Sequence, residues 1–182
     1  MFETKEALYK VEEVAAYLLN ESLARNSFMT AAKLYNMLYF AQAAFLVHYD
    51  GVPCFEDDIV AWACGASVPA LHHDYGLASM TIFFPTTTLL AVPENGFGLV
   101  EVPYSDDFIR NKEDRKLLDA VVGYGMHFSP MAMTERVTSQ YPWKYGDLYG
   151  DRRYKSGRKC FNDVIPKEKI WEYFYDYKNK KG

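Results

Sequence analysis

The chain has 182 residues, of which 49% are hydrophobic and 16% aromatic, and its formal net charge is −4. This length suits one compact domain, and the apolar content excludes an intrinsically disordered chain. Cys54, Cys64 and Cys160 are odd in number and widely spaced, which favours reduced thiols over a disulfide framework or a zinc site.

We expect no secretory signal at the start of the chain, because residues 1–10 are charged and contain no apolar core. No later apolar run reaches the roughly 18 to 20 residues that a bilayer span requires. We therefore expect a cytoplasmic protein without a membrane partner.

The first predicted element is a helix over Glu3–Arg25. Its apolar residues Leu8, Val11, Leu18 and Leu19 recur at helical spacing, while charged residues occupy the other faces. We expect this apolar stripe to pack on the next helix of the chain, which follows after a short polar hinge.

Residues 30–49, with the sequence TAAKLYNMLYFAQAAFLVHY, are predicted to form the central helix of the domain. Fifteen of these twenty residues are apolar or aromatic and Lys33 is the one full charge, so most sides of the helix must be buried. Thr30 can cap the N-terminus, and Asn36 and Gln42 interrupt the apolar run. The residues expected in the core are Leu34, Tyr35, Leu38, Tyr39, Ala41, Phe45 and Leu46.

Short elements follow the central helix. A short helix or strand is expected at Glu56–Trp62 and another at Pro69–Tyr75. A β-hairpin is predicted over residues 80–103, because Thr86–Val92 and Gly98–Val102 are rich in β-branched and apolar residues and flank an Asn-Gly pair. We expect the hairpin to lie on the helical body, since a two-stranded ribbon is marginally stable by itself.

Two more helices are predicted after the hairpin. Ser105 caps the first, which runs to about Tyr124 and is expected to end at the glycines that follow. Ser129, followed by proline at the first helical position, begins a short helix that extends through Val137 or Thr138.

The last part of the chain is expected to contain a break, a loop and a final helix. Gln140–Trp143 is predicted to interrupt the helical structure, because proline disfavours helix in the residue before it. Residues 145–162 are predicted to form a mobile loop. Pro166 begins the last helix, which carries Trp171 and Tyr175.

Charge is distributed unevenly, because residues 1–146 hold ten Lys+Arg against eighteen Asp+Glu, whereas residues 147–182 hold ten against six. A dense basic cluster lies within the predicted loop. It is either a solvated segment that balances the acidic body or a surface for an acidic protein partner; nucleic acid is the least favoured partner, since no helix-turn-helix or zinc pattern accompanies it. The cluster consists of Arg152, Arg153, Lys155, Arg158 and Lys159.

The sequence contains no catalytic motif of the phosphate-loop, dinucleotide-binding, GxSxG or HExxH type. The carboxylates of residues 56–58 could bind a cation, but an acidic helix start explains them equally well. Cys64 could form a thiol–imidazole pair with His72 or His127. We expect no catalytic residue, no cofactor and no metal.

Aromatic residues near predicted helix ends are candidates for a partner surface, since large aromatics dominate binding energy at protein interfaces. The alternative is that each tryptophan fills a junction between helices in the core. The candidate partner-binding residues are Trp62, Trp143, Trp171, Tyr175, Arg152, Arg153 and Arg158.

The motif KLYNMLYFAQ at residues 33–42, followed by Ala61-Trp62, Gly65 and Pro142-Trp143, resembles the Panacea domain of SocA-like antitoxins and phage-associated proteins. The resemblance spans nearly the whole chain. Two positions depart from the family pattern, since Ala66 stands where a proline is usual and Ser139 where a histidine is usual. The residues that match the family motif are Lys33, Leu34, Leu38, Tyr39, Gln42, Trp62, Gly65, Pro142 and Trp143.

The resemblance implies a mostly helical domain that neutralises a toxin encoded beside it by direct protein binding. Some members of the family instead deliver a toxin to a protease. We therefore expect a cytoplasmic antitoxin with a cognate toxin as partner, with a proteolytic adaptor, a phage-encoded interaction protein and, least favoured, an enzyme as alternatives. The expected fold is a mainly α, single-domain helical bundle around a buried central helix, with a small antiparallel β-hairpin.

Overall fold

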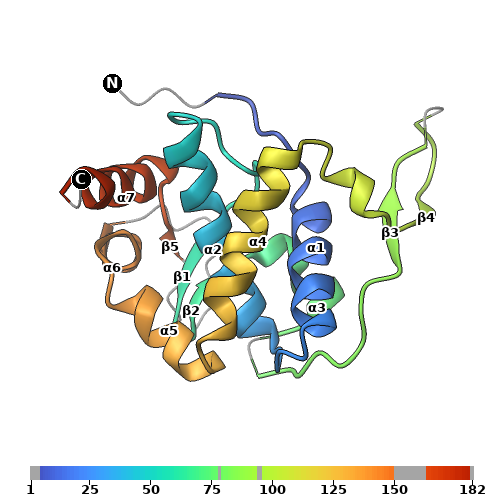
Figure 1. The fold of residues 1–182 in the computed structure, drawn as a ribbon, viewed down its shortest axis with the longest axis horizontal. Coiled ribbons are helices and arrows are strands. Elements are labelled where there is room, and N and C mark those ends of the chain that lie inside the picture. Colours follow the sequence, from blue (N-terminus) through green and yellow to red (C-terminus); the bar gives the residue numbers. More distant parts are fainter. Residues whose placement is uncertain (1–4, 78, 94–95, 150–162, 181–182) are drawn as a thin grey trace.

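The computed structural model describes residues 5–77, 79–93, 96–149 and 163–180. Helix α2, Ala31–His48, runs through the middle of the molecule. It is surrounded by α1 (Val11–Ala24), α4 (Lys112–Met126), α5 (Pro130–Thr138) and α7 (Lys167–Lys180) (Figure 1). The predicted mainly α fold around a buried central helix is thus confirmed.

The burial of α2 follows the composition of its sequence. Every residue from Ala31 to Ala43 is buried, and the Thr30 hydroxyl accepts a hydrogen bond from the Lys33 amide as the predicted N-cap. The Lys33 ammonium is satisfied by the Ser27 hydroxyl at 3.0 Å and the Phe28 carbonyl at 3.3 Å, and burial lowers its pKa. No helix in the part of the chain that the structure describes is long and apolar enough to cross a membrane.

Helix α1 begins at Val11, so the predicted start at Glu3 is wrong. The backbone amides of Leu8 and Tyr9 donate instead to the carbonyls of Pro53 and Cys54, so this segment is tied to residues 53–54 and is not helical. Residues 1–4 lie outside the described part. Leu8 is exposed and does not belong to the core.

A buried carboxylate ties the segment before α1 to the helices. The hydroxyls of Tyr9 and of Tyr49, at the end of α2, both donate to Asp114 in the first turn of α4. Asp114 is buried, and the position near a helix N-terminus favours its negative charge. Three segments far apart in sequence therefore meet at one side chain.

A small antiparallel sheet covers one side of α2 in the order β2-β1-β5. Strand β1, Val60–Trp62, lies in the region where a short helix or strand was expected. Strands β2 (Gly65–Ser67) and β5 (Asp163–Val164) were not predicted, because two or three residues are too few to show a period. A 3₁₀ turn at Pro69–Leu71 and helix α3, His72–Tyr75, form the second expected short element.

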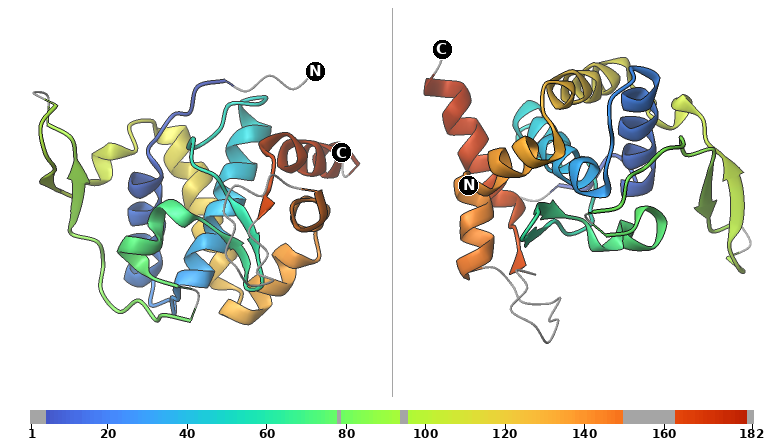
Figure 2. Two further views of the ribbon diagram at one scale, coloured as in Figure 1. Left: turned by 180° about the vertical axis from the view of Figure 1, so that it is seen from behind. Right: turned by 90° about the horizontal axis from the view of Figure 1, so that it is seen from below.

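The predicted β-hairpin is confirmed as β3, Thr88–Ala91, paired with β4, Val100–Pro103, with Leu89 opposite Val102. It does not lie flat on the helical body as expected but projects beside α1 (Figure 1, Figure 2). At its base, the Asn20 side chain bonds both the amide and the carbonyl of Thr86, at 2.8 and 2.9 Å.

Two predicted boundaries of α4 are corrected. Ser105 caps a 3₁₀ turn at Asp106–Phe108, and Asn111 caps α4 itself. Gly123 and Gly125 lie inside the helix. A Cβ at Gly125 would lie 3.0 Å from the Met37 sulfur, so the glycine allows α4 to approach α2 closely.

The predicted break at Gln140–Trp143 is confirmed only at Gln140, which separates α5 from the next helix; Tyr141–Trp143 are helical, since α6, Tyr141–Tyr149, begins there. Helix α5 does end at Thr138, as expected. Pro142 occupies the first turn of α6, where proline is tolerated because that amide has no partner within the helix. Residues 145–149 of the predicted loop are therefore helical, and residues 150–162 lie outside the described part.

Candidate functional site

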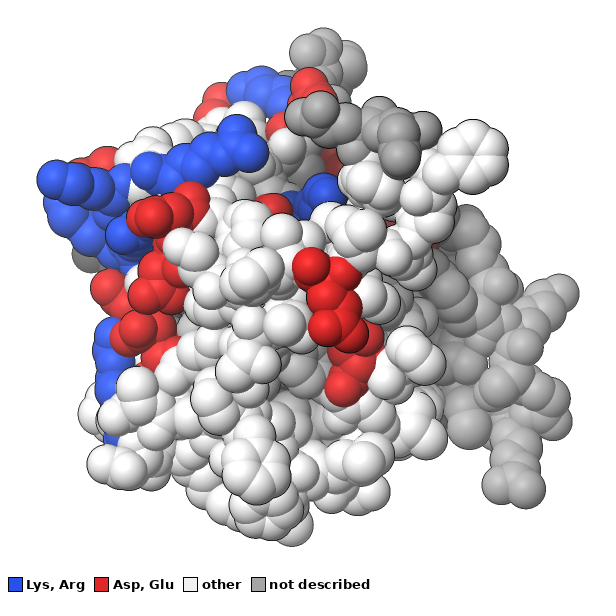
Figure 3. Space-filling view, turned by 90° about the vertical axis from the view of Figure 1, so that its right-hand side faces the viewer, with Lys and Arg blue, Asp and Glu red and all other residues white. Residues whose placement is uncertain are grey.

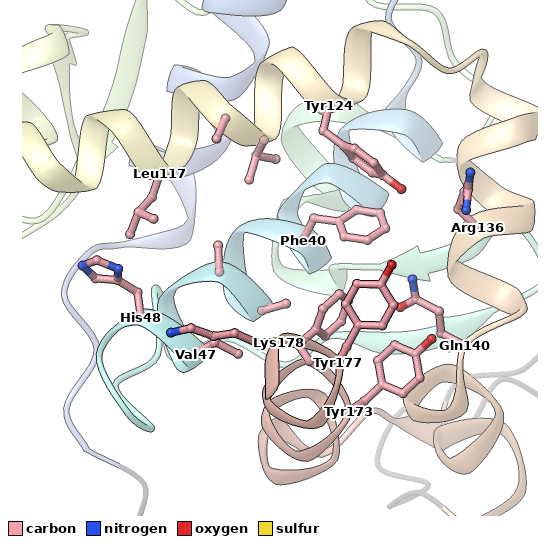
Figure 4. A pocket seen from close by; sticks show the side chains of 15 residues that line it. Phe40, Val47, His48, Leu117, Tyr124, Arg136, Gln140, Tyr173, Tyr177 and Lys178 are labelled. Carbon is pink, nitrogen blue, oxygen red and sulfur yellow. The ribbon is translucent and has the colours of Figure 1, made fainter. Parts of the chain in front are cut away.

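The structure contains a groove of about 560 Å³ between α2, α4 and α7, which we call the α2–α4–α7 groove (Figure 4). Its volume lies within the range of roughly 300 to 1,000 Å³ that is usual for binding pockets. It is lined by Phe40, Ala43, Ala44, Val47, His48, Leu117, Ala120, Val121, Tyr124, Arg136, Gln140, Tyr173, Phe174, Tyr177 and Lys178.

Small side chains keep the groove open. Ala43 and Ala44 of α2 and Ala120 of α4 line it, where larger residues would fill the space between the helices. Aromatic rings form its walls, because Phe40 packs edge-on against Tyr124 and Phe174, with ring centroids 5.1 and 6.1 Å apart. Such a surface is mostly apolar but carries tyrosine hydroxyls at its mouth (Figure 4).

The charged residues that line the groove are cationic. Arg136 and Lys178 belong to the lining, and none of the described lining residues is an aspartate or glutamate. Among the described residues, neither cation forms an ion pair; the Arg136 guanidinium instead lies 5.2 Å from the centroid of the Phe128 ring. The groove is thus a local positive site on an acidic protein.

The hairpin presents a second surface, an exposed apolar one that we call the hairpin surface. Residues 76–104 contain no lysine or arginine and two glutamates, Glu94 and Glu101. From this side the centre and lower part of the described surface are uncharged apart from a stripe of acidic side chains, while basic and acidic side chains gather at the left (Figure 3). The exposed apolar residues are Phe83, Phe84, Leu90, Val92, Phe97, Leu99 and Val100.

The predicted partner-binding aromatics lie in two places, neither of which is the groove floor or the hairpin surface. Trp62 of β1 stacks on His72 at 5.2 Å, and the indole N–H of Trp143 in α6 donates to the Gly65 carbonyl at 2.9 Å. Trp171 and Tyr175 stack on each other at 4.8 Å along α7. Trp143 and Trp171 both pack against the hydrophobic core.

The predicted basic cluster falls outside the described residues. Arg152, Arg153 and Arg158 all lie in the range 150–162. Their assignment to a partner surface stays a prediction.

The residues of the sequence motif build the scaffold around the β1–β2 turn. The buried Asn36 side chain accepts from the Ala66 amide at 2.8 Å and donates to the Cys64 carbonyl at 3.2 Å. Thr134 of α5 donates to the same carbonyl at 2.9 Å. Gly65 has φ +100°, and a Cβ there would lie 2.2 Å from Oδ1, the side-chain oxygen of Asn36. A glycine is therefore required beside Asn36.

Gln42 lies further along α2 than Asn36, and its side chain likewise forms hydrogen bonds with the backbone of a second segment, residues 54–55. Its side-chain oxygen accepts from the amides of Cys54 and Phe55, at 3.0 and 3.2 Å, and its nitrogen donates to the Phe55 carbonyl at 3.2 Å. The side chain is fully buried, so these bonds satisfy the backbone of a turn that packs on the helix.

Of the groups considered for chemistry, His72 has a structural contact. His72 shares a 2.7 Å hydrogen bond with the Ser67 hydroxyl, and burial lowers the pKa of the imidazole. Ser67 is fully buried, so its hydroxyl is closed to a substrate in this conformation. Cys64 is exposed. Within the described ranges, no group of His, Cys, Asp and Glu side chains has the arrangement of a metal site.

The sequence pattern did not predict the α2–α4–α7 groove. The signal available was the Ala43-Ala44 pair within a helix otherwise rich in large apolar residues, but a small residue in a helix is equally typical of close packing. Only the distance between the helices shows that these alanines line an open groove.

Comparison of the chain with protein-family models, with curated proteins and with solved structures gave no match.

Proposed function

We propose that this protein is an antitoxin that acts in the cytoplasm and neutralises a toxin encoded beside it by direct protein–protein binding. The motif in α2 and its companions Gly65 and Trp143 resemble the Panacea domain, which supports this class of function. The proposal makes the chain one member of a stoichiometric complex and assigns it no reaction.

The hairpin surface is the observation that carries the proposal. Phe84 and Phe97 are 80% and 87% exposed, and within the described part of the chain no third strand pairs with either edge of the two-stranded sheet. Monomeric proteins rarely expose contiguous apolar patches of this kind, because they lead to aggregation unless a partner covers them. No lysine in this segment protects the strand edges. In the proposed complex, a permanently bound partner protein covers the hairpin surface.

The motif residues and the hairpin occupy different parts of the structure, which also supports a binding function. The motif residues Asn36, Gln42 and Gly65 hold the scaffold, and the hairpin lies outside the motif. A scaffold of this kind can remain the same while the hairpin is adapted to a particular toxin.

Co-expression with the product of the neighbouring gene tests the proposal. We expect that product to arrest growth by itself, and this protein to restore growth and to co-purify with it in a one-to-one complex. A neighbouring product that is harmless, or one that remains toxic in the presence of this protein, contradicts the antitoxin function.

The surface is tested with the double variant Phe84→Glu and Phe97→Glu. Because both side chains are exposed, we expect the melting temperature to stay within a few degrees of the wild type, while neutralisation is lost. The matched control is Met131→Glu on α5, which is 74% exposed but far from the hairpin in the fold and should neutralise normally. If the double variant neutralised the toxin as well as the wild type, the hairpin would not be part of the interface.

The proteolytic adaptor is distinguished by the lifetime of the partner. An adaptor accelerates the disappearance of the toxin in cells that contain both this protein and a housekeeping protease, whereas a stoichiometric antitoxin leaves toxin levels stable. An enzyme would instead bind a metal or ligand near Cys64.

A further inference from the structure

We propose that the α2–α4–α7 groove binds an amphipathic helix of the partner protein whose apolar face is flanked by acidic residues. This inference rests on the proposed function, because it names the kind of segment that the partner inserts. It concerns a surface distinct from the hairpin, so the complex would have two contact regions.

The shape of the groove suits a helix face. Three helices enclose it, and its floor consists of alanine, valine and leucine side chains with aromatic walls. A volume of about 560 Å³ accommodates several side chains of a bound segment. Helices bind such grooves by inserting apolar residues at positions i, i+3 or i+4, and i+7.

The mouth of the groove carries residues that contribute most at protein interfaces. Tyr124, Tyr173 and Tyr177 present their hydroxyls around it, and Arg136 stands beside them (Figure 4). Tyrosine and arginine are enriched among the residues that dominate binding energy, since they combine large apolar area with hydrogen-bonding groups.

Charge complementarity selects an acidic occupant. Arg136 lies at one side of the groove, and His48 and Lys178 lie towards the other (Figure 4). Because no described residue that lines the groove is a carboxylate, a helix with glutamates on both sides of its apolar face would lie near Arg136 at one end and Lys178 at the other. A basic helix would place like charges together.

A second copy of this chain fits the groove less well than such a helix. The helices of the described part already use their apolar faces in their own core, where α1, α4, α5 and α7 pack around α2. A helix that inserts into the groove therefore comes from another protein.

The test uses a pair of designed peptides and needs no toxin. The first is a fluorescein-labelled 16-residue helix with leucines at i, i+4, i+7 and i+11 and glutamates beside them; the second has lysine at every glutamate. Fluorescence anisotropy measures binding to the full chain. We expect the acidic peptide to bind at least tenfold more tightly than the basic one.

Two variants locate the binding site. Ala120→Leu places a larger side chain in the groove and should weaken the acidic peptide at least tenfold, whereas Ala70→Leu, an exposed alanine outside the groove, should not. Arg136→Glu combined with Lys178→Glu should invert the preference, so that the basic peptide binds better. Unchanged melting temperatures show that the variants are folded.

Four results would overturn the inference: equal binding of the two peptides, wild-type affinity in Ala120→Leu, tight binding of decanoate without binding of either peptide, or self-association that Ala120→Leu abolishes. The third would assign the groove to a small anionic amphiphile and the fourth to a second copy of the chain. These four results concern the groove alone and do not test neutralisation. A failure of neutralisation in the co-expression experiment would likewise leave the peptide measurement unchanged. The two proposals can therefore fail separately.

Discussion

At the scale of single residues, buried polar side chains connect segments that are distant in sequence. The Asn36 side chain forms hydrogen bonds with the backbone of the β1–β2 turn, and the Asp114 carboxylate accepts hydrogen bonds from the hydroxyls of Tyr9 and Tyr49. Removing one partner of a buried hydrogen bond leaves the other unsatisfied, which costs about 1 to 3 kcal/mol. We therefore expect substitutions of these residues to have large effects on stability.

The first prediction concerns Gly65 and uses Gly98 as its control. Both have positive φ, +100° and +78°, so alanine strains the backbone at either position, by about 1 to 2 kcal/mol. At Gly65 the new Cβ also meets Asn36, whereas nothing lies within 4 Å of it at Gly98. Gly65→Ala should therefore lose about 2 kcal/mol more than Gly98→Ala in urea unfolding. Equal losses would show that Asn36 moves aside freely.

The second prediction concerns alkaline pH. The hydrogen bond to Asp114 raises the pKa of Tyr49 from 10.0 to about 12. Between these values the unfolded chain has lost this proton and the folded chain keeps it, so the stabilisation is complete below pH 10 and disappears as pH rises towards 12. We expect the free energy of unfolding to fall over this range.

Tyr49→Phe is the control for the pH measurement. It should lose about 1.5 kcal/mol at neutral pH, because a hydrogen bond to a charged group is removed. Its free energy of unfolding should then decline less steeply between pH 10 and 12 than that of the wild type. Parallel curves for the two proteins would contradict the role of this hydrogen bond.

At the scale of elements, boundaries depend on contacts that a local pattern does not contain. Helix α1 begins later than its apolar spacing predicted, because the amides of Leu8 and Tyr9 find partners at Pro53 and Cys54. Helix α6 forms where Pro142 predicted a break, because proline in a first turn removes an amide that needs no helical partner. The hairpin pairs as its turn residues predicted, but its position beside α1 involves the distant side chain of Asn20, which bonds the Thr86 backbone.

The third prediction concerns the attachment of the hairpin. Asn20→Ala removes both hydrogen bonds to the Thr86 backbone, so the amides of β3 and β4 should exchange with solvent at least tenfold faster, while global stability falls by about 1 to 2 kcal/mol. Hydrogen exchange measured by mass spectrometry gives both quantities.

Tyr75→Phe is the matched control for the hairpin. It removes the hydroxyl contact to the Thr86 side chain at 2.9 Å but keeps both backbone bonds. Exchange in β3 and β4 should change less than in Asn20→Ala. If the two variants accelerate exchange equally, the backbone bonds of Asn20 are not what anchors the hairpin.

At the scale of the whole molecule, one helix organises the core. The side chain of Leu38 is completely buried, among neighbours contributed by the surrounding helices. A domain of this size is stabilised by only about 5 to 15 kcal/mol, so a single unpaired charge at its centre can unfold it.

The fourth prediction is that Leu38→Asp abolishes the fold. The unpaired carboxylate should cost roughly 5 kcal/mol or more, which exceeds or approaches the total stability. Circular dichroism should show no cooperative melting. Leu38→Met, a swap of similar volume, should cost less than about 1.5 kcal/mol and melt cooperatively. A soluble Leu38→Asp variant with a sharp melting transition would contradict the central position of this helix.

The sequence by itself determined which segment forms the centre, because fifteen apolar or aromatic residues among residues 30–49 leave no wet face wide enough for a surface helix. It also determined the Thr30 cap and the β3–β4 pairing, since caps and tight turns depend on neighbouring residues.

The tertiary structure alone decided the candidate site. Phe40, Ala120, Arg136 and Lys178 come from four helices and lie together only when the chain is folded, so no local period marks them. Whether Ala44 touches a neighbouring helix or lines an open groove depends on how far apart the helices pack, and that distance is set by every side chain between them.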